Sequence, residues 1–304
     1  MKILVVLLSL ASILSAQSRI PVILDTDIGD DVDDALALAF ALQSPELEVR
    51  AVTTVIDDVD SRARLAWKQL GVYARRNVLL AMGAPEPLLD PTRQIQSAQF
   101  KILTPADAIP ASAHRPAVEV ILDTLRNSPA KMTLITLGPL TNIALVLKTD
   151  PSIKERIERI VMMGGAYASG QPEYNVRRDH IAAEIVFQSG VPITAVGLDV
   201  TLKCKMRPQD LDRLRAAGDP RTHFLLRLID LWKSETHQEY PILHDPLAVA
   251  VAFRPKLIEA APGHVSVVDG VTRFNEQSGG STSVARQVDA AAFLDLFAAR
   301  ISAP

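Results

Sequence analysis

The sequence of 304 residues predicts an α/β fold, a Rossmann-like open sheet of mainly parallel strands flanked by helices. Short apolar runs of strand length alternate with longer helical segments, which is typical of βαβ units. The composition, 48% hydrophobic and 22% charged, is that of a globular protein. No linker or change of composition divides the chain, so we expect a single domain over residues 19–304.

The expected elements follow in order along the chain. A short apolar run at 20–24 predicts a buried parallel strand, and a strongly apolar helix is expected at 33–43. Further strands are expected at 47–55, 78–81, 132–136, 160–163 and 193–197, with a strand pair at 265–272. Further helices are expected at 61–76, 118–126, 140–148, 181–189, 208–217, 223–235, 246–253 and 288–301. Residues 91–113 have mixed polar composition and several prolines, which favours a long loop or lid.

The first 18 residues have the layout of a secretory signal peptide. Lys2 precedes an apolar run from Ile3 to about Leu14, and small residues follow it. The run has about a dozen residues, whereas a helix that spans a bilayer needs about 20. We therefore expect export to the periplasm or the exterior, without a stable membrane anchor. The alternative is a buried first strand or helix.

Charge is unevenly distributed. Residues 25–34 (DTDIGDDVDD) contain six aspartates and no basic residue, although the formal net charge of the whole chain is only −3. A chain with this balance has no excess of basic residues of the kind that binds the phosphates of nucleic acid. Cys204 is the only cysteine, which excludes an internal disulfide framework and a cysteine-based zinc site. Ligands of open α/β sheets bind beyond the carboxyl ends of the strands, so the acidic segment marks the candidate site.

Helix capping alone explains only part of this acidic segment. Asp30 or Asp31 could cap the next helix, and Asp33 and Asp34 would gain from its dipole. The acids at the end of the strand remain unexplained, and a hard divalent cation accounts for them better because it prefers carboxylate oxygens.

Two other cation-dependent sites fit the segment poorly. An EF-hand beginning at Asp25 would need an acid or amide at Gly29 and a glutamate at Leu36. A phosphotransferase of the haloacid-dehalogenase type also has an Asp-x-Asp pair after its first strand. It would need a later Thr or Ser, a Lys and a second acidic pair, and no convincing set is present.

Six motifs, in order, resemble those of the inosine–uridine-preferring nucleoside hydrolases. They are Asp25-Thr-Asp27-Ile-Gly29 followed by Asp33-Asp34-Ala-Leu-Ala, then Val52-Thr-Thr-Val55, Leu137-Gly-Pro-Leu-Thr-Asn142-Ile-Ala, Met163-Gly-Gly165 followed by Glu173-Tyr-Asn175, Gly197-Leu-Asp199-Val-Thr201, and His244-Asp245-Pro-Leu-Ala. The resemblance implies the nucleoside hydrolase fold and hydrolysis of the N-glycosidic bond of ribonucleosides to ribose and free base, in nucleoside salvage. It also implies a tightly bound Ca²⁺ and a dimer or tetramer.

By the same resemblance, four residues would hold the Ca²⁺: the carboxylates of Asp27, Asp34 and Asp245 and the backbone carbonyl of Leu137. Asp25 would not touch the cation but would hold the neighbouring ligands and backbone in position. Asp27 would also be the general base, taking a proton from a metal-bound water.

The resemblance assigns the substrate contacts as well. His244 would protonate the departing base. The residues that would bind the ribose hydroxyls are Asp33, Asp58, Glu173 and Asn175.

The chain departs from the family pattern at three places. The spacing from Asp27 to Asp33 is two residues longer than in the shorter family form, and in an alternative register Asp31 would contact the ribose. The usual Gly-Asn after the second strand reads Ile56-Asp57-Asp58, and residues 91–113 lack the usual His-Gly and Asp-Gly-Leu-Gly elements. Two alternatives therefore stay open: a non-catalytic nucleoside- or ribose-binding protein that keeps the metal site, and a hydrolase of a modified ribosyl substrate.

Overall fold

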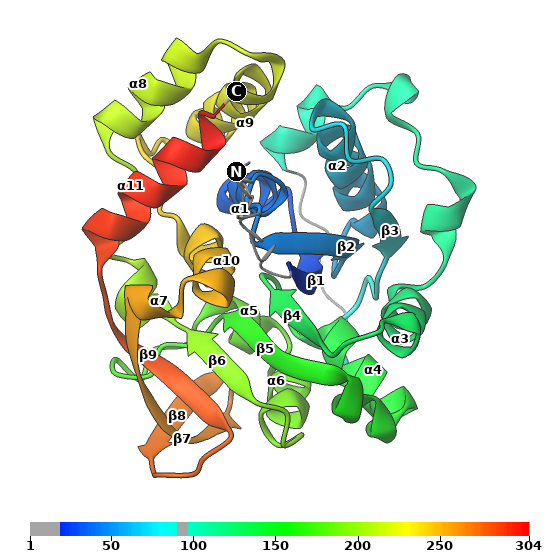
Figure 1. Ribbon diagram of the computed structural model, residues 1–304, viewed down its shortest axis with the longest axis vertical. Coiled ribbons are helices and arrows are strands. Elements are labelled where there is room, and N and C mark those ends of the chain that lie inside the picture. Colours follow the sequence, from blue (N-terminus) through cyan, green and yellow to red (C-terminus); the bar gives the residue numbers. More distant parts are fainter. Residues whose placement is uncertain (1–18, 90–96, 304) are drawn as a thin grey trace, which may run out of the picture.

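A computed structural model describes residues 19–89 and 97–303, and Figure 1 shows its arrangement. Within these residues, nine strands form one sheet in the order β3-β2-β1-β4-β5-β6-β9-β7-β8. The strands are β1 (Ile20–Thr26), β2 (Leu47–Thr54), β3 (Leu79–Met82), β4 (Met132–Thr136), β5 (Ile157–Met163), β6 (Ile193–Val196), β7 (Ile258–Val268), β8 (Val271–Glu276) and β9 (Thr282–Val288). All neighbouring strands from β3 to β9 pair in parallel, and β7 pairs antiparallel with β8 and β9. The predicted fold class is confirmed.

Helices cover both faces of this sheet. The α-helices are α1 (Asp33–Leu42), α2 (Val59–Val72), α3 (Ala117–Asn127), α4 (Thr141–Thr149), α5 (Tyr174–Arg178), α6 (His180–Phe187), α7 (Leu198–Thr201), α8 (Pro208–Ala217), α9 (Pro220–Thr236), α10 (His244–Phe253) and α11 (Ala290–Ile301). Short 3₁₀ helices are η1 (Ala98–Ile102), η2 (Pro105–Asp107), η3 (Ala111–His114), η4 (Pro151–Arg156) and η5 (Pro255–Leu257). In the described part of the chain, no helix has the length and apolar character needed to cross a membrane.

The two faces of the sheet belong to two separate cores. Successive strand side chains point to opposite faces, so Leu24 of β1 belongs to the core with α1, α2 and α10, whereas Ile23 belongs to the core with α3, α4 and α6. Strands buried on both faces are apolar without interruption, and this explains why the short apolar runs predicted the parallel strands correctly.

The strand order places the candidate site. From β1 the chain moves outward to β2 and β3, and it then returns to β4 on the other side of β1. The loops after β1 and β4 therefore diverge and leave a crevice at their carboxyl ends, which is where open α/β sheets bind ligands. The acidic segment follows β1, and Leu137 follows β4 directly.

The sequence expectations were least accurate in the C-terminal third. The strand pair expected at 265–272 is the end of a longer hairpin, β7–β8, whose turn at Asp269 and Gly270 has positive φ at both residues. Strand β9 was missed, and the closing helix begins at Ala290, after that strand. Helix α9 starts at Pro220 instead of residue 223, because Asp219 caps it with bonds to two backbone N–H groups.

Candidate active site

Three carboxylates meet at the crevice. Asp33 and Asp34 lie in the first turn of α1, and Asp245 lies in the first turn of α10. All three are buried, and one oxygen from each lies within 4.8 Å of the other two. The Asp33 carboxylate also accepts a hydrogen bond of 3.0 Å from the Asp245 backbone N–H, which ties the two helix starts together. The alternative ribose contact, Asp31, is exposed.

Asp27 lies beside this trio, on the side of the β4 loop. Its side chain is buried against Gly138, and a Cβ at that glycine would come within 2.8 Å of Asp27 Oδ1. The preceding residue, Leu137, accepts a hydrogen bond of 2.6 Å on its carbonyl from Asn175 Nδ2. A carbonyl oxygen has two lone pairs, so this bond leaves one lone pair for another partner. Asp27, Leu137 and Asn175 thus form the second wall of the crevice.

Burial makes this concentration of negative charge costly. It raises the pKa of Asp27, Asp33 and Asp245 well above the usual range, and neighbouring carboxylates raise each pKa further. Burial also raises the pKa of Asp34 to about 8, and the charge of Asp33 adds to the rise. At neutral pH these acids can all be ionised only if positive charge lies close to them.

A divalent cation fits these residues. The donors are all oxygens, several are carboxylates, and they converge in a buried position, which is the environment that hard cations such as Ca²⁺ prefer. The N-termini of α1 and α10 also meet at the trio, and the positive ends of their dipoles offset part of the charge.

Asp25 lies behind the crevice, within β1. Its Oδ1 accepts hydrogen bonds from Thr53 Oγ1 at 2.5 Å and from Asn142 Nδ2 at 2.8 Å. Burial raises its pKa to about 7, although both hydrogen bonds oppose the rise. Asn142 further donates to the Thr54 carbonyl and accepts from the Ala84 N–H. Asn142 therefore links β1 to the ends of β2 and β3.

Glu173 and Asp58, two predicted ribose contacts, bond to backbone N–H groups. Glu173 caps α5 through the N–H groups of Asn175 and Val176, and it also accepts from the Gly165 N–H. It therefore fixes the position of Asn175. Asp58 caps α2 by accepting a hydrogen bond of 3.0 Å from the Ser61 N–H.

His244 begins α10, one residue before Asp245. Its Nδ1 lies 2.7 Å from the hydroxyl oxygen of Thr201, the last residue of α7. Burial lowers its pKa to about 4, so the imidazole is neutral at pH 7 in this environment. Cys204 is fully buried beside this contact, where it bonds through its backbone to Thr201 and Leu243.

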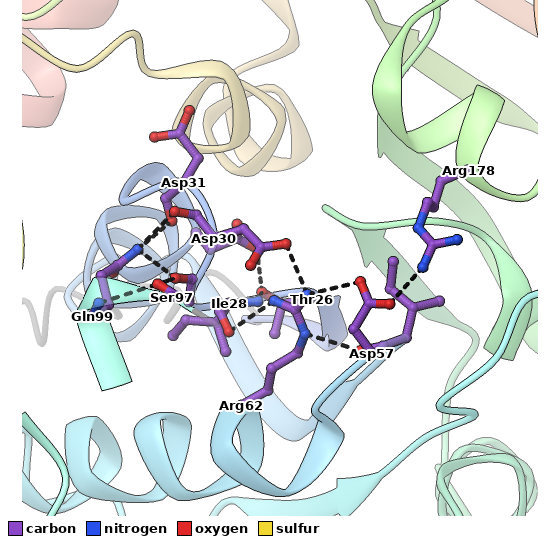
Figure 2. Close-up of polar contacts among 12 residues, drawn as sticks. Thr26, Ile28, Asp30, Asp31, Asp57, Arg62, Ser97, Gln99 and Arg178 are labelled. Atoms are coloured by element: carbon purple, nitrogen blue, oxygen red, sulfur yellow. Dashed lines mark hydrogen bonds and ion pairs between the residues drawn. The ribbon is translucent and has the colours of Figure 1, made fainter. Parts of the chain in front are cut away.

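Arg62 was not predicted as a site residue. It lies on the inner face of α2 with 1% of its side chain exposed (Figure 2). It donates to the backbone carbonyls of Ile56 at 3.0 Å and Ile28 at 3.1 Å, and to Asp30 Oδ2 at 2.9 Å. The excess of acids in the segment that follows β1 was a signal that a counter-charge was needed. Nothing in the sequence identified this arginine as its source.

The segment 97–114 packs against the acidic loop. Figure 2 shows Ser97 and Gln99 reaching the loop backbone, and Gln99 Nε2 lies within 3.1 Å of the carbonyl oxygens of Gly29, Asp30 and Asp31. The sequence predicted a loop or lid over 91–113. Of these, residues 91–96 lie outside the described residues, and the remainder contains η1, η2 and most of η3 with short connections between them.

The family model for the inosine-uridine preferring nucleoside hydrolases matches residues 22–295. The chain belongs to this metal-dependent family, and it is an N-ribosyl hydrolase that acts on ribonucleosides. The non-catalytic binding protein considered above is therefore disfavoured.

Relatives and solved structures agree with this assignment. The pyrimidine-specific ribonucleoside hydrolase RihA of Citrobacter koseri is 34% identical over 93% of this chain and 98% of the relative. The plant nucleoside hydrolase PpNRh1 superposes with a TM-score of 0.82 at 26% identity, covering 94% of this chain and all of the other. A purine-preferring ribonucleoside hydrolase from Gardnerella vaginalis gives a TM-score of 0.81 at 29% identity, covering 93% and 98% of the two chains.

Proposed function

We propose that this protein hydrolyses the N-glycosidic bond of ribonucleosides with the help of a bound Ca²⁺ and with Asp27 as the general base. The observation that supports the cation most strongly is the buried trio of Asp33, Asp34 and Asp245, whose carboxylate oxygens converge within 4.8 Å. Buried charges of one sign need a counter-ion, and oxygen donors select a hard cation.

The Ca²⁺ would be held by Asp27, Asp34 and Asp245 together with the Leu137 carbonyl. When bound, it supplies positive charge that favours ionised carboxylates and a more acidic neighbouring water. Asp33 lies next to these ligands, but the Asp245 N–H already occupies one of its oxygens. In this proposal its other oxygen binds a ribose hydroxyl.

Asp27 takes the proton of the water that attacks the anomeric carbon. Its carboxylate lies at the wall formed by Gly138, next to the Leu137 carbonyl and Asn175. Asn175, Asp33 and Asp58 would bind the sugar as it becomes positively charged, and Glu173 holds Asn175 in place.

His244 acts on the other product, the free base. Because burial keeps the imidazole neutral, it carries one N–H. If the Thr201 hydroxyl donates to Nδ1, the N–H is on Nε2, where it can donate a hydrogen bond to the leaving base. Full transfer of a proton leaves a neutral ring only if it starts from the imidazolium, a form that the negative charge on the departing base favours.

We also propose that the catalytic unit is a single domain, residues 19–304, that it is exported, and that it forms a dimer or tetramer. The sequence of residues 1–18 is the reason to propose export, and the resemblance to the family is the reason to propose an oligomer. Cell fractionation and light scattering test these two points.

The test of function is release of free base from uridine, cytidine, inosine and adenosine, measured with Ca²⁺ and with a chelator. Base release that the chelator abolishes and Ca²⁺ restores is the expected result. No release from any of these nucleosides with Ca²⁺ bound would overturn hydrolysis of unmodified ribonucleosides. Asp27→Ala should lower turnover by orders of magnitude in a folded protein, and near-normal turnover would remove Asp27 as the base.

A further inference from the structure

Four charged residues of alternating sign form a chain beside the acidic crevice (Figure 2). Asp30 binds Arg62 at 2.9 Å, Arg62 lies 3.7 Å from Asp57, and Asp57 binds Arg178 at 2.5 Å. We call Asp30, Arg62, Asp57 and Arg178 the ion chain. Arg62 and Asp57 each have only 1% of their side chains exposed. At such depth an ion pair is strongly sensitive to the loss of one partner.

The ion chain connects three parts of the site. Asp30 lies in the loop after β1, three residues from Asp27. Asp57 lies in the turn between β2 and α2, directly before Asp58. Arg178 ends α5, the short helix that begins next to Glu173 and carries Asn175. Each part therefore contains at least one proposed site residue, and the ion pairs connect the three parts to one another.

The turn after β2 needs such support. Ile56 and Asp57 have φ values of 51° and 58°, in the left-handed region that non-glycine residues avoid, and Ile56 is β-branched. Strained residues persist where their surroundings hold them, and they concentrate at functional sites. Here Arg62 donates to the Ile56 carbonyl while its charge, with that of Arg178, faces the Asp57 carboxylate.

The geometry points to Arg62 as a positioning residue, which acts through the ion chain to hold the Asp27 loop, the turn before Asp58 and helix α5 in the arrangement that binds the cation and the nucleoside. This inference rests on the proposed function. A guanidinium suits the role because its planar fork serves Ile28, Ile56 and Asp30 at once, which a lysine ammonium on a flexible stem cannot do.

Calorimetric titration with Ca²⁺ alone, together with kcat and KM for a nucleoside, tests this role in two Arg62 variants. If Arg62 acted only by its positive charge, it would repel the cation. The Arg62→Met variant would then bind Ca²⁺ more tightly than the wild type, and the Arg62→Lys variant would bind it equally well. A positioning residue gives the opposite result. Both variants should bind Ca²⁺ about 10- to 100-fold more weakly and lose kcat to a similar extent.

Arg64→Met is the matched control. Arg64 lies on the same helix and is changed in the same way, but within residues 19–89 and 97–303 its guanidinium donates to the Thr104 carbonyl in an exposed contact and to none of the ion chain. It should leave Ca²⁺ binding and kcat within about twofold of the wild type. Arg62→Lys at wild-type values, or tighter Ca²⁺ binding by Arg62→Met, would overturn the inference.

The ends of the ion chain give a second test that keeps Arg62 in place, in case its variants do not fold. Asp30→Asn and Arg178→Gln are made singly and together. If the ion chain acts as a unit, the combined loss in Ca²⁺ affinity and in kcat/KM is smaller than the product of the two single losses. If the double variant instead loses the product of the two single losses, Asp30 and Arg178 act independently, and the inference is overturned. If the wild type itself neither binds Ca²⁺ nor releases base, the proposed function fails instead.

Discussion

Removing divalent cations with a chelator and raising the pH from about 5.5 to about 8 should lower the thermal unfolding midpoint of the protein. The reason lies in the buried acids of the crevice, which are most stable in the protonated form when no cation is present. Asp25 and Asp34 have folded-state pKa values of about 7 and about 8, both above the ordinary value of 3.8.

A folded-state pKa that lies above the unfolded value means that the folded protein binds the proton more tightly. The stability gained in this way is complete below the unfolded value of 3.8, and it is lost as the pH rises through about 7 for Asp25 and about 8 for Asp34. At 1.36 kcal/mol per pKa unit, Asp25 alone corresponds to about 4 kcal/mol over the whole range. Asp34 changes stability in the same direction.

Differential scanning calorimetry across this pH range measures the effect. Between about pH 5.5 and about pH 8 the part of this stability that is lost through Asp25 alone is about 2 kcal/mol, which should lower the midpoint by roughly 4 °C or more in a chain of this size. Added Ca²⁺ should raise the midpoint more at about pH 8 than at about pH 5.5, because the cation binds the ionised carboxylates. Asp25→Asn is the control, since an amide does not titrate and should make the pH dependence shallower.

Two results would refute this reasoning. One is a chelated protein whose midpoint stays constant or rises between these pH values. The other is a Ca²⁺-induced stabilisation that is the same at both ends of the range.

Further changes test individual contacts. Asp245→Asn should weaken Ca²⁺ binding at least about 10-fold, and unchanged metal content by elemental analysis would contradict its role as a ligand. Asp33→Asn should raise KM for the nucleoside while Ca²⁺ affinity in calorimetry changes little; a parallel loss of Ca²⁺ would make Asp33 a ligand instead. Thr201→Val removes the partner of His244 Nδ1 and should lower kcat about 10-fold at similar KM, and an unchanged kcat would show that this contact does not orient the imidazole. Asn142→Ala should cost about 2–3 kcal/mol in chemical denaturation because it removes three hydrogen bonds that link β1 to the ends of β2 and β3, and a cost near zero would contradict that linking role.

The sequence predicted the parts of the site that follow from local patterns. Strands that are buried on both faces are mostly apolar, so β1 and β4 were recognisable, and the residues at and just beyond their ends marked the crevice. Asp33 and Asp34 were expected at the start of a helix, and they lie in its first turn.

Arg62 could not be predicted in the same way. On a charged amphipathic helix an arginine is usually solvent-exposed, and two of its partners are the backbone carbonyls of Ile28 and Ile56. Their positions depend on how the turns after β1 and β2 fold, and backbone carbonyls carry no sequence signature. Strand β9 was missed for a related reason. Its residues TSVARQV do not alternate regularly between apolar and polar, because its burial is decided by β6 and β7 on either side.

The buried position of the lone cysteine, Cys204, makes it a natural reporter of local opening. Burial raises the pKa of its thiol to about 12, so almost no reactive thiolate is present and a labelling reagent cannot reach the sulfur in the closed structure. Modification therefore requires the backbone around Thr201 and Leu243 to separate, and this is the segment that orients His244. The kinetics of thiol labelling thus measure how often that wall of the crevice opens, without any engineered probe.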